Sequence, residues 1–249
     1  MTNMATTTIF QQGRVYCQYD SSEISQFQPA MLDAQFWQQK NAVTGSAQGR
    51  GTTWFVKYND DSSSLEKQWV LRHYYRGGLI GKLINDSYWF SSQQNTRAAK
   101  EFALLTTMQQ LALPSPKPIA YRVVRRGLLY RADLLSSRIE NAQDLVAILS
   151  NQTLSHDLWK KIGATVKRFH HHNIYHHDLN AHNILIDEHN DIFVIDFDRG
   201  EIRPTNQDSW QQANMARLQR SFMKELQQLQ YFHFNQDNWK SLLEGYLSH

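Results

Sequence analysis

The first half of the chain has the residue pattern of a small β-sheet. The segments 52–58 (TTWFVKY) and 67–74 (KQWVLRHY) are rich in β-branched and aromatic residues, and the polar segment between them provides a turn. The segment 119–135 (IAYRVVRRGLLYRADLL) predicts a hairpin that turns at Arg126–Gly127. Together these segments predict an antiparallel sheet.

Apolar residues recur at helical spacing in four further segments, and each of them predicts an amphipathic helix. The segments are 92–113, 155–173, 209–232 and 236–247. The first would end at the sequence PSPKP, because proline cannot continue a helix. The second has Ser155 in the N-cap position. One helix therefore accompanies the strands, and the other three follow them.

The order of these elements predicts an α+β protein with two lobes. A strand-rich N-terminal lobe with one main helix would cover residues 1–138, and a mainly helical C-terminal lobe would cover residues 139–249. The change in character falls near Ser136–Asn141. We expect a cleft between the lobes, where ligands commonly bind.

The composition excludes several classes of protein. A 249-residue chain that is 41% hydrophobic can bury a core, and no segment approaches the ~20 apolar residues of a membrane-spanning helix. The N-terminus lacks a basic start followed by an apolar run, so we expect no secretory signal and a cytoplasmic protein. The single cysteine, Cys17, excludes an internal disulfide, and the net charge of +3 is too small to indicate nucleic acid binding. The composition does not indicate an oligomeric state.

The segment 175–200 (YHHDLNAHNILIDEHNDIFVIDFDRG) concentrates acidic residues, histidines and asparagines. Its pattern predicts a loop, a short strand, a turn, a second short strand and a second loop. Asp178 and Asn183 lie on the first loop and Asp196 follows the second strand, so a tight hairpin would bring the three together. Phosphoryl transfer needs such a set. One carboxylate accepts the proton of the attacking hydroxyl, while an amide oxygen and another carboxylate hold Mg²⁺.

The histidines of this region allow a competing interpretation, which is a zinc site. His170, His171 and His172 are consecutive at the expected end of a helix, so they would point in different directions and would not converge on one ion. We therefore interpret them as a solvated helix C-terminus, where partial positive charge is favourable.

The sequence HHDLNAHNIL resembles the catalytic loop H-R-D-L-x-x-x-N of protein-kinase-like enzymes, and IDFD resembles their D-F-G motif. The resemblance implies that Asp178 is the catalytic base and that Asn183 and Asp196 are Mg²⁺ ligands. It assigns His176 to a structural position. Asp198 replaces the usual glycine, so the loop would lose its freest residue. No A-P-E motif follows, which argues against a long activation loop.

Two glycines in the N-terminal half are candidates for a loop that covers the phosphates of a nucleotide. Gly49 and Gly51 lie in SAQGRGTTWFVKY, just before the first predicted strand. Glycine lets a backbone approach phosphate closely. The alternative interpretation of so short a pattern is an ordinary turn.

A cation is also expected in this half, because protein-kinase-like enzymes hold the phosphates with a strand lysine that pairs with a helix glutamate. The sequence WVLRHY places Arg72 at that position, and arginine keeps the charge and can fork onto phosphate. Its expected partner is Glu101 in the helix RAAKEFALL, and the alternative is that Glu101 is a solvated helix residue. Lys57 and Lys82 are weaker substitutes for Arg72.

Several segments together resemble the bacterial lipopolysaccharide kinase family, and within it the members that act on 3-deoxy-D-manno-octulosonic acid (Kdo). The segments lie between residues 45 and 205, and RHYYRGGLIGKL in combination with DFDRG is the most specific. The resemblance implies ATP-dependent and Mg²⁺-dependent phosphorylation of a Kdo hydroxyl, at position 4, on Kdo–lipid A. It also implies peripheral binding to the cytoplasmic face of the inner membrane. Three alternatives remain: a heptose kinase of the same family, an atypical small-molecule or protein kinase, and a nucleotide-binding module without catalysis.

The segment 72–82 (RHYYRGGLIGK) holds more cations and glycines than ATP alone requires. The acceptor implied by the resemblance carries a carboxylate and phosphates. We therefore expect Arg76 and Lys82 to contact the acceptor, with His73 among the cations that meet its anionic groups. The alternative is that Arg76 is a solvated or structural residue and that the neighbouring aromatic residues pack the N-terminal lobe.

Overall fold

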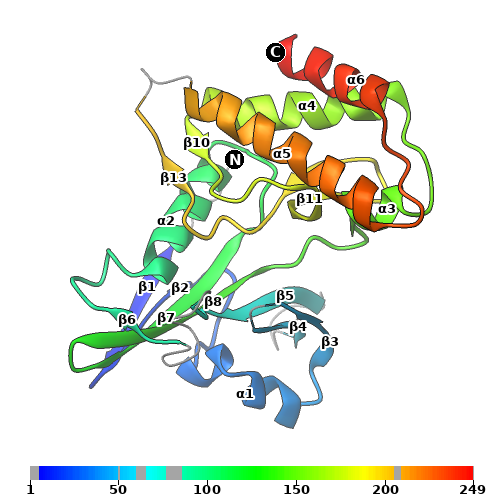
Figure 1. The fold of residues 1–249 in the computed structure, drawn as a ribbon. Coiled ribbons are helices and arrows are strands. Elements are labelled where there is room, and N and C mark those ends of the chain that lie inside the picture. Colours follow the sequence, from blue (N-terminus) through cyan, green and yellow to red (C-terminus); the bar gives the residue numbers. More distant parts are fainter. Residues whose placement is uncertain (1–5, 50, 60–65, 77–85, 205–208, 249) are drawn as a thin grey trace. The chain divides into compact units, whose positions relative to one another are not determined.

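The computed structural model describes residues 6–49, 51–59, 66–76, 86–204 and 209–248. In this part of the chain an antiparallel sheet is combined with six α-helices, which is a mixed α/β architecture (Figure 1). The chain divides into two compact units. The first contains Met1–Gln110 and Pro116–Arg138, and the second contains Leu111–Ser115 and Ile139–His249.

The first unit is built around one antiparallel sheet, whose strands follow the order β1-β2-β7-β8-β5-β4-β3 with β6 paired to β8. The strands are β1 (Thr7–Gln12), β2 (Val15–Asp20), β3 (Val43–Gln48), β4 (Thr52–Asn59), β5 (Glu66–His73), β6 (Tyr88–Trp89), β7 (Pro118–Arg126) and β8 (Leu129–Ser137). The helical segments are η1 (Pro29–Leu32), α1 (Ala34–Gln39) and α2 (Arg97–Gln110).

Helices cover both faces of this sheet. Neighbouring residues of a strand point to opposite faces, so successive residues of β7 contact different helices. On β7, the ring of Tyr121 packs against Phe102 of α2, with ring centroids 5.2 Å apart. The next residue, Arg122, instead reaches Asp33, the residue before α1, through two hydrogen bonds of 2.7 and 2.8 Å. The sheet therefore has an α2 face and an α1 face, and the position of a residue along its strand decides which face it joins.

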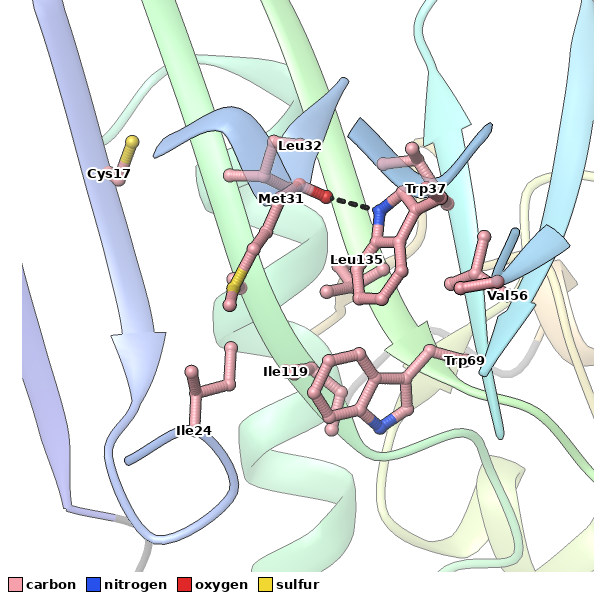
Figure 2. Packing of buried hydrophobic residues seen from close by; sticks show 12 residues of the cluster. Cys17, Ile24, Met31, Leu32, Trp37, Val56, Trp69, Ile119 and Leu135 are labelled. Carbon is pink, nitrogen blue, oxygen red and sulfur yellow. Dashed lines mark hydrogen bonds between the residues drawn. The ribbon is translucent and has the colours of Figure 1, made fainter. Parts of the chain in front are cut away.

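The α1 face carries the hydrophobic core drawn in Figure 2. Trp37 of α1 and Trp69 of β5 are both 1% exposed, and their rings meet edge to face with centroids 6.0 Å apart. The indole N–H of Trp37 donates a 2.7 Å hydrogen bond to the carbonyl of Met31, so its polar group is satisfied inside the core. Cys17 belongs to the same cluster, and burial raises the pKa of its thiol to about 12. The thiol therefore stays protonated and unreactive.

The strands and the helix predicted in the first half of the sequence are confirmed. β4 and β5 match the two strand-like segments, and β7 and β8 form the hairpin, with Gly127 in the left-handed region at φ 62°. The helix begins at Arg97 and not at residue 92, because the side chain of Thr96 accepts a hydrogen bond from the Ala99 N–H and caps it. The sequence pattern does not predict β1, β2, β3 or α1, because pairing and packing within the unit decide their structure.

The second unit is mainly helical and contains two short sheets, one with the order β12-β11-β9 and one that pairs β10 with β13. The helical segments are α3 (Leu145–Leu149), α4 (His156–His171), η3 (Ala181–Asn183), α5 (Ser209–Gln228) and α6 (Gln236–Leu247). The strands are β9 (Gln143–Asp144), β10 (Ile174–Tyr175), β11 (Ile184–Ile186), β12 (Ile192–Val194) and β13 (Glu201–Ile202). None of the helices in the described part of the chain is long and apolar enough to span a membrane.

The helices and the hairpin predicted in the second half are also confirmed. α4 begins directly after Ser155, whose Oγ accepts a 3.3 Å hydrogen bond from the N–H of Leu158. α5 ends at Gln228, before the predicted residue 232. β11 and β12 form the expected antiparallel hairpin, in which Ile184 pairs with Val194.

Helices α4 and α6 lie side by side and approach so closely that only glycine fits at their contact (Figure 1). A Cβ atom on Gly163 would lie 1.9 Å from the carbonyl oxygen of Leu242. A Cβ atom on Gly245 would lie 2.0 Å from the carbonyl oxygen of Lys160. Each glycine therefore makes room for the backbone of the other helix, and this contact holds the C-terminal helix in place.

Replacing either glycine by alanine is expected to destabilise the second unit. Alanine normally favours a helix by about 1 kcal/mol over glycine, but here the added methyl group meets backbone atoms and forces the helices apart. We expect Gly163→Ala and Gly245→Ala each to lower the free energy of unfolding by about 1–3 kcal/mol in urea titrations. Gln212→Ala, on the exposed side of α5, is the control and should change it by less than about 0.5 kcal/mol. Wild-type stability of both alanine variants would contradict the close contact.

Candidate active site

His176 determines the geometry of the loop that carries Asp178. Its side chain is buried, its Nδ1 accepts a 3.1 Å hydrogen bond from the Asp178 backbone N–H, and its Nε2 donates a 2.9 Å hydrogen bond to the carbonyl of Ile195. Because one ring nitrogen accepts and the other donates, the imidazole is neutral. Burial lowers the pKa of His176, which keeps the ring in that form. One buried side chain therefore links the loop at residue 178 to the end of β12.

Asn183 lies beside Asp178 at the other end of the same loop. Its Nδ2 group donates a 3.0 Å hydrogen bond to the backbone carbonyl of Asp178. The amide oxygen Oδ1 therefore points away from that carbonyl. The backbone carbonyl of Asn183 accepts a 2.9 Å hydrogen bond from the N–H of Ile195, where the β11–β12 hairpin ends. Asp196 is the next residue. The hairpin thus brings Asp196 to the end of the unit at which Asp178 and Asn183 lie.

The backbone after β12 has two left-handed residues, Asp196 and Arg199, both with φ 61°. Such a conformation costs a non-glycine residue about 1 kcal/mol or more and persists only where its surroundings hold it. The ring of Phe197 holds it here, since it is buried with its centroid 4.8 Å from that of His176. The loop has aspartate in place of the freest residue at position 198, and the backbone there does not need the freedom of glycine. The positive φ values fall on other positions, and aspartate at 198 causes no strain.

Helix α5 contributes buried polar contacts to the loop that no motif in the sequence indicates. Asn214 is 1% exposed, its Oδ1 accepts a 3.3 Å hydrogen bond from the backbone N–H of His176, and its Nδ2 donates a 3.0 Å bond to the carbonyl of the same residue. Ser221 accepts a 3.0 Å hydrogen bond from the backbone N–H of Ala181. Both lie on one face of α5, seven residues apart in the numbering. Polar residues on the inward face of a helix are the signal that would have identified them.

Asp178 itself faces an arginine of the same helix. Arg217 places its Nη1 atom 3.4 Å from Oδ1 of Asp178. Both side chains are nearly half exposed, so the pair contributes about 1 kcal/mol or less to stability. Its importance lies in position, because Arg217 brings a second charge to the carboxylate that is the candidate base. No motif in the sequence indicates this contact of Arg217.

His170 corrects our interpretation of the consecutive histidines. His171 is exposed as expected, but His170 is 2% exposed, and its Nδ1 lies 2.7 Å from the hydroxyl of Tyr246 on α6. Burial lowers the pKa of His170 to about 4. The reason is its place on the inward face of α4, four residues after Val166. Among the residues that the structure describes, no group of three or more His, Cys, Asp and Glu side chains is arranged to hold a metal ion.

In the first unit, Arg72 and Glu101 form the ion pair that the sequence predicted. Nη2 of Arg72 lies 2.5 and 2.6 Å from the two carboxylate oxygens of Glu101, and the hydroxyl of Tyr74 donates a further 2.6 Å hydrogen bond to the same carboxylate. Glu101 is 3% exposed, so the alternative of a solvated helix residue is wrong. The pair forms because Arg72 and Tyr74 alternate with Leu71 and point to the α2 face of the sheet.

Gly49 and Gly51 lie in the tight turn between β3 and β4, where Gln48 pairs with Thr52. The N–H of Gly49 donates a 3.0 Å hydrogen bond to the carbonyl of Gly51. A Cβ atom on Gly51 would lie 2.0 Å from the ring of Tyr75, so a side chain at this position would displace that ring. Packing against Tyr75 is thus one physical reason for glycine at 51, and a role toward phosphate stays a prediction.

The other candidate cations of the first unit, Lys57 and Arg76, have neighbours other than Glu101 in the contacts that follow. Lys57 of β4 forms an exposed ion pair with Glu66 of the neighbouring strand β5, at a distance of 3.3 Å. The guanidinium of Arg76 lies 5.1 Å from the ring centroid of Tyr88. Lys82 lies outside the described residues.

His73 does not join Arg72, and our expectation that it faces an anionic acceptor is wrong. It points to the α1 face, where its Nδ1 lies 2.6 Å from Asp133 and its Nε2 lies 3.3 Å from Asp86. Burial alone would lower the pKa of His73, but the two carboxylates outweigh it and raise the pKa above its ordinary value. Its charge is therefore matched within the protein.

Comparison with known proteins places this chain in a family. Residues 34–246 match the family described as "Lipopolysaccharide kinase (Kdo/WaaP) family". The chain belongs to the lipopolysaccharide kinase family. It is 46% identical over 230 residues to a protein of Vibrio vulnificus named 3-deoxy-D-manno-octulosonic acid kinase, which covers 92% of this chain and 94% of that protein. It is 47% identical over 223 residues to a protein of the same name from Mannheimia succiniciproducens, which covers 88% and 90% of the two chains.

The match to the lipopolysaccharide kinase family includes both sets of candidate residues, the Arg72–Glu101 pair of the first unit and the loops of the second. β1 and β2 precede residue 34 and lie outside it. The resemblance drawn from short motifs is thus confirmed over most of the chain. A third relative, the 3-deoxy-D-manno-octulosonic acid kinase of Vibrio cholerae, is 45% identical over 84% of this chain and 85% of its own.

The buried His170 predicts how the stability of this lipopolysaccharide kinase depends on pH. The pKa is about 4 in the folded protein and near 6.5 in an unfolded chain, so between these values only the unfolded state takes up the proton. The contribution of His170 to the free energy of unfolding is therefore fully present above pH 6.5. It decreases by roughly 3 kcal/mol as the pH drops toward 4. The charge of Lys167 adds to the effect, while the hydrogen bond to Asn214 opposes it.

Urea unfolding of wild type and His170→Gln at pH 7.5, 6.0 and 5.0 (roughly the range in which the unfolded histidine gains its proton) measures this dependence. The variant should lose less stability than wild type on acidification, because residue 170 no longer titrates. His189→Gln is the control, since His189 is exposed and should leave the pH dependence unchanged. Parallel curves for wild type and His170→Gln would contradict the assignment.

Proposed function

We propose that this protein is a Kdo kinase, which transfers the γ-phosphoryl group of ATP to the hydroxyl at position 4 of a Kdo residue on Kdo–lipid A, with Mg²⁺ as its cofactor. The names of its relatives and its membership of the lipopolysaccharide kinase family support this proposal. The structural observation that carries it is the chain of hydrogen bonds from Asp178 through Asn183 to the residue before Asp196. That chain connects the candidate base Asp178 with Asn183 and Asp196, the two residues that would bind Mg²⁺ through oxygen atoms.

In this proposal Asp178 accepts the proton of the attacking hydroxyl. The backbone of Asp178 is held on both sides of its Cα atom, since its N–H donates to buried His176 and its carbonyl accepts from Asn183. Its carboxylate is nearly half exposed and therefore accessible to an acceptor. Arg217 would restrict the rotation of this carboxylate and add a positive charge near an anionic sugar. A positioned carboxylate of this kind typically contributes 10²–10⁴-fold to the rate.

Asn183 and Asp196 would hold Mg²⁺. The donors fit this ion, because Mg²⁺ prefers oxygen and is commonly bound through one or two protein oxygens together with water and substrate phosphates. The Nδ2 group of Asn183 is committed to Asp178, which orients the amide with its oxygen available for such a role. When bound, Mg²⁺ neutralises charge on the phosphates and aligns them for transfer.

Arg72 would contact the ATP phosphates, with Glu101 and Tyr74 as its positioning residues. The buried carboxylate of Glu101 fixes the guanidinium through Nη2, and the ring of Tyr74 lies 5.3 Å from its centre. The planar guanidinium of an arginine held in this way can bind phosphate in a fork. Gly49 and Gly51 would let the β3–β4 turn approach the phosphates.

The two units would form the two lobes of a protein-kinase-like fold, with the boundary at residues 138 and 139. Arg76 and Lys82 would contact the carboxylate or phosphates of the acceptor. Because that acceptor is anchored in a bilayer, the enzyme would work as a peripheral protein at the cytoplasmic face of the inner membrane.

The direct experiment incubates the protein with ATP, Mg²⁺ and Kdo–lipid A and measures the mass of the lipid. We expect a gain of one phosphate on the Kdo residue, and none when Mg²⁺ is chelated. A lipid core that carries heptose is the competing acceptor. Phosphate found only on heptose would replace Kdo by heptose in the proposal, and ATP binding without transfer to either acceptor would indicate a nucleotide-binding module.

Replacing Asp178 by asparagine tests the base. Asn keeps the shape of the side chain and the backbone hydrogen bonds but cannot accept the proton, so kcat should fall by ~10²-fold or more while the Kd for Mg²⁺-ATP stays near that of wild type. Asp196→Asn should instead weaken Mg²⁺-ATP binding as well as turnover. Asp157→Asn, in the exposed first turn of α4, is the matched control. Wild-type turnover of Asp178→Asn would remove Asp178 from the mechanism.

A double-mutant cycle tests whether Glu101 acts through Arg72. We expect Arg72→Ala and Glu101→Ala each to raise the KM for ATP, and the double variant to lose much less kcat/KM than the sum of the two single losses. The reason is that Glu101 has no role toward phosphate once its guanidinium partner is gone. The exposed pair Lys57 and Glu66 on adjacent strands serves as the control cycle and should show little effect. Additive losses at Arg72 and Glu101 would contradict the coupling.

A further inference from the structure

One end of the sheet in the first unit carries exposed apolar side chains beside arginines. Trp89 is 70% exposed and Leu128 is 64% exposed. They lie close together because β6 pairs with β8 through Trp89 and Leu129, and the N–H of Phe90 donates a 2.9 Å hydrogen bond to the carbonyl of Leu128 (Figure 1). All seven tryptophans are described, and Trp89 alone among them is exposed.

Three arginines share this end of the sheet. The β1–β2 turn meets the β7–β8 hairpin there, since the N–H of Arg125 donates a 2.9 Å hydrogen bond to the carbonyl of Arg14. Arg126 is the last residue of β7, and all three arginines are exposed. No carboxylate of the described residues forms an ion pair with any of them. By contrast Arg122 and Arg131, farther from the turns, are paired with aspartates.

Arg125 is held in place. Its Nε donates a 2.9 Å hydrogen bond to the carbonyl of Gly127, and its guanidinium lies 4.7 Å from the ring centroid of Phe90. Arg14 and Arg125 line a groove of about 550 Å³, which Phe90 and Gln93 also border. The groove therefore offers cationic and hydrogen-bonding groups next to the apolar tip formed by Trp89 and Leu128.

We propose that this hairpin-tip surface, made of Arg14, Trp89, Arg125, Arg126 and Leu128, docks the enzyme on an anionic phospholipid bilayer. The indole of Trp89 is amphipathic and suits the boundary between head groups and acyl chains, and Leu128 beside it adds apolar area. The arginines meet lipid phosphates, and the groove accommodates head groups. The combination of an apolar tip with cations that have no acidic partner matches a negatively charged membrane surface.

This inference deepens the proposed function, because it assigns a surface to the peripheral membrane binding that a lipid-anchored acceptor requires. The binding itself needs neither ATP nor acceptor. A vesicle experiment without either therefore tests the surface alone, and its failure is separate from a failure of Kdo phosphorylation.

The experiment measures cosedimentation of the full-length protein with phosphatidylethanolamine–phosphatidylglycerol vesicles and with phosphatidylcholine vesicles. Wild type should bind the anionic vesicles more tightly, and added salt should weaken binding. Each cation near an anionic surface strengthens binding about fivefold, so the variant Arg14→Gln/Arg125→Gln/Arg126→Gln should bind on the order of 100-fold more weakly. The variant Trp89→Ser/Leu128→Ser should bind about tenfold or more weakly.

Matched control variants remove the same kinds of side chain, apolar or cationic, at exposed positions outside the hairpin-tip surface. Tyr231→Ser/Leu247→Ser removes two side chains of the second unit that are 67% and 76% exposed. Lys100→Gln/Arg220→Gln/Lys224→Gln removes three exposed cations. Both controls should bind anionic vesicles within about twofold of wild type, because per-residue lipid attraction applies only near the membrane surface. If the controls lose as much binding as the hairpin-tip variants, the surface is not the docking site.

A second measurement uses wild type and one conservative variant. Brominated acyl chains quench a tryptophan that enters the bilayer interface, so anionic brominated vesicles should quench wild type and should quench Trp89→Phe much less. Equal quenching of the two proteins would overturn the proposal. Size-exclusion chromatography addresses the alternative occupant: a dimer of wild type that Trp89→Ser/Leu128→Ser converts to a monomer would assign the surface to a second copy of the chain.

Discussion

The candidate active site depends on the two hydrogen bonds of the His176 imidazole, which require opposite roles of its ring nitrogens. Protonation would turn the acceptor Nδ1 into a donor that faces the N–H of Asp178, and the contact would be lost. Burial opposes protonation, since the charged ring would have to be desolvated. A neutral histidine is therefore a condition for the position of the candidate base, although it has no proposed contact with substrate.

The remaining contacts of the loop follow from this arrangement. Asn214 satisfies both the N–H and the carbonyl of His176, so the backbone beside the buried ring has no unpaired group. Phe197 packs on the same ring and holds the left-handed backbone at Asp196. Helix α5 and the β11–β12 hairpin thus meet at one histidine, and buried contacts hold the loop at the position of the candidate base. A rigid site lowers the reorganisation required in the transition state.

In the first unit, the alternating direction of side chains along strand β5 decides which residues can reach the candidate site. On β5, Leu71 joins the core on the α1 face while Arg72 points to α2 and its buried partner Glu101. His73 points back to the α1 face and to Asp133. Adjacent cations in the sequence therefore have unrelated environments, and only one of them is held by a carboxylate on the α2 helix. A cluster of charges in a sequence is for this reason a weak guide to a binding site when it lies on a strand.

Much of the fold and part of the site could be predicted from sequence. Strands β4, β5, β7 and β8 and helices α2, α4, α5 and α6 have local signals of periodicity, turns and caps, and these signals do not depend on distant partners. The hairpin between Asn183 and Asp196 is local in the same sense. The ion pair of Arg72 with Glu101 could also be predicted from the sequence, because a known motif pairs a cation on one strand with a glutamate on the helix that follows it.

Other features were decided by tertiary structure alone. The burial of His170, the support of the loop by Asn214 and the contact of Arg217 with Asp178 all depend on which face of a helix meets a distant segment. The same holds for Trp89, whose exposure follows from the pairing of a two-residue strand with β8. Periodicity identifies the apolar face of a helix or strand but does not name its partner. The partners of buried polar groups are therefore set by packing, which brings together residues that the sequence keeps far apart.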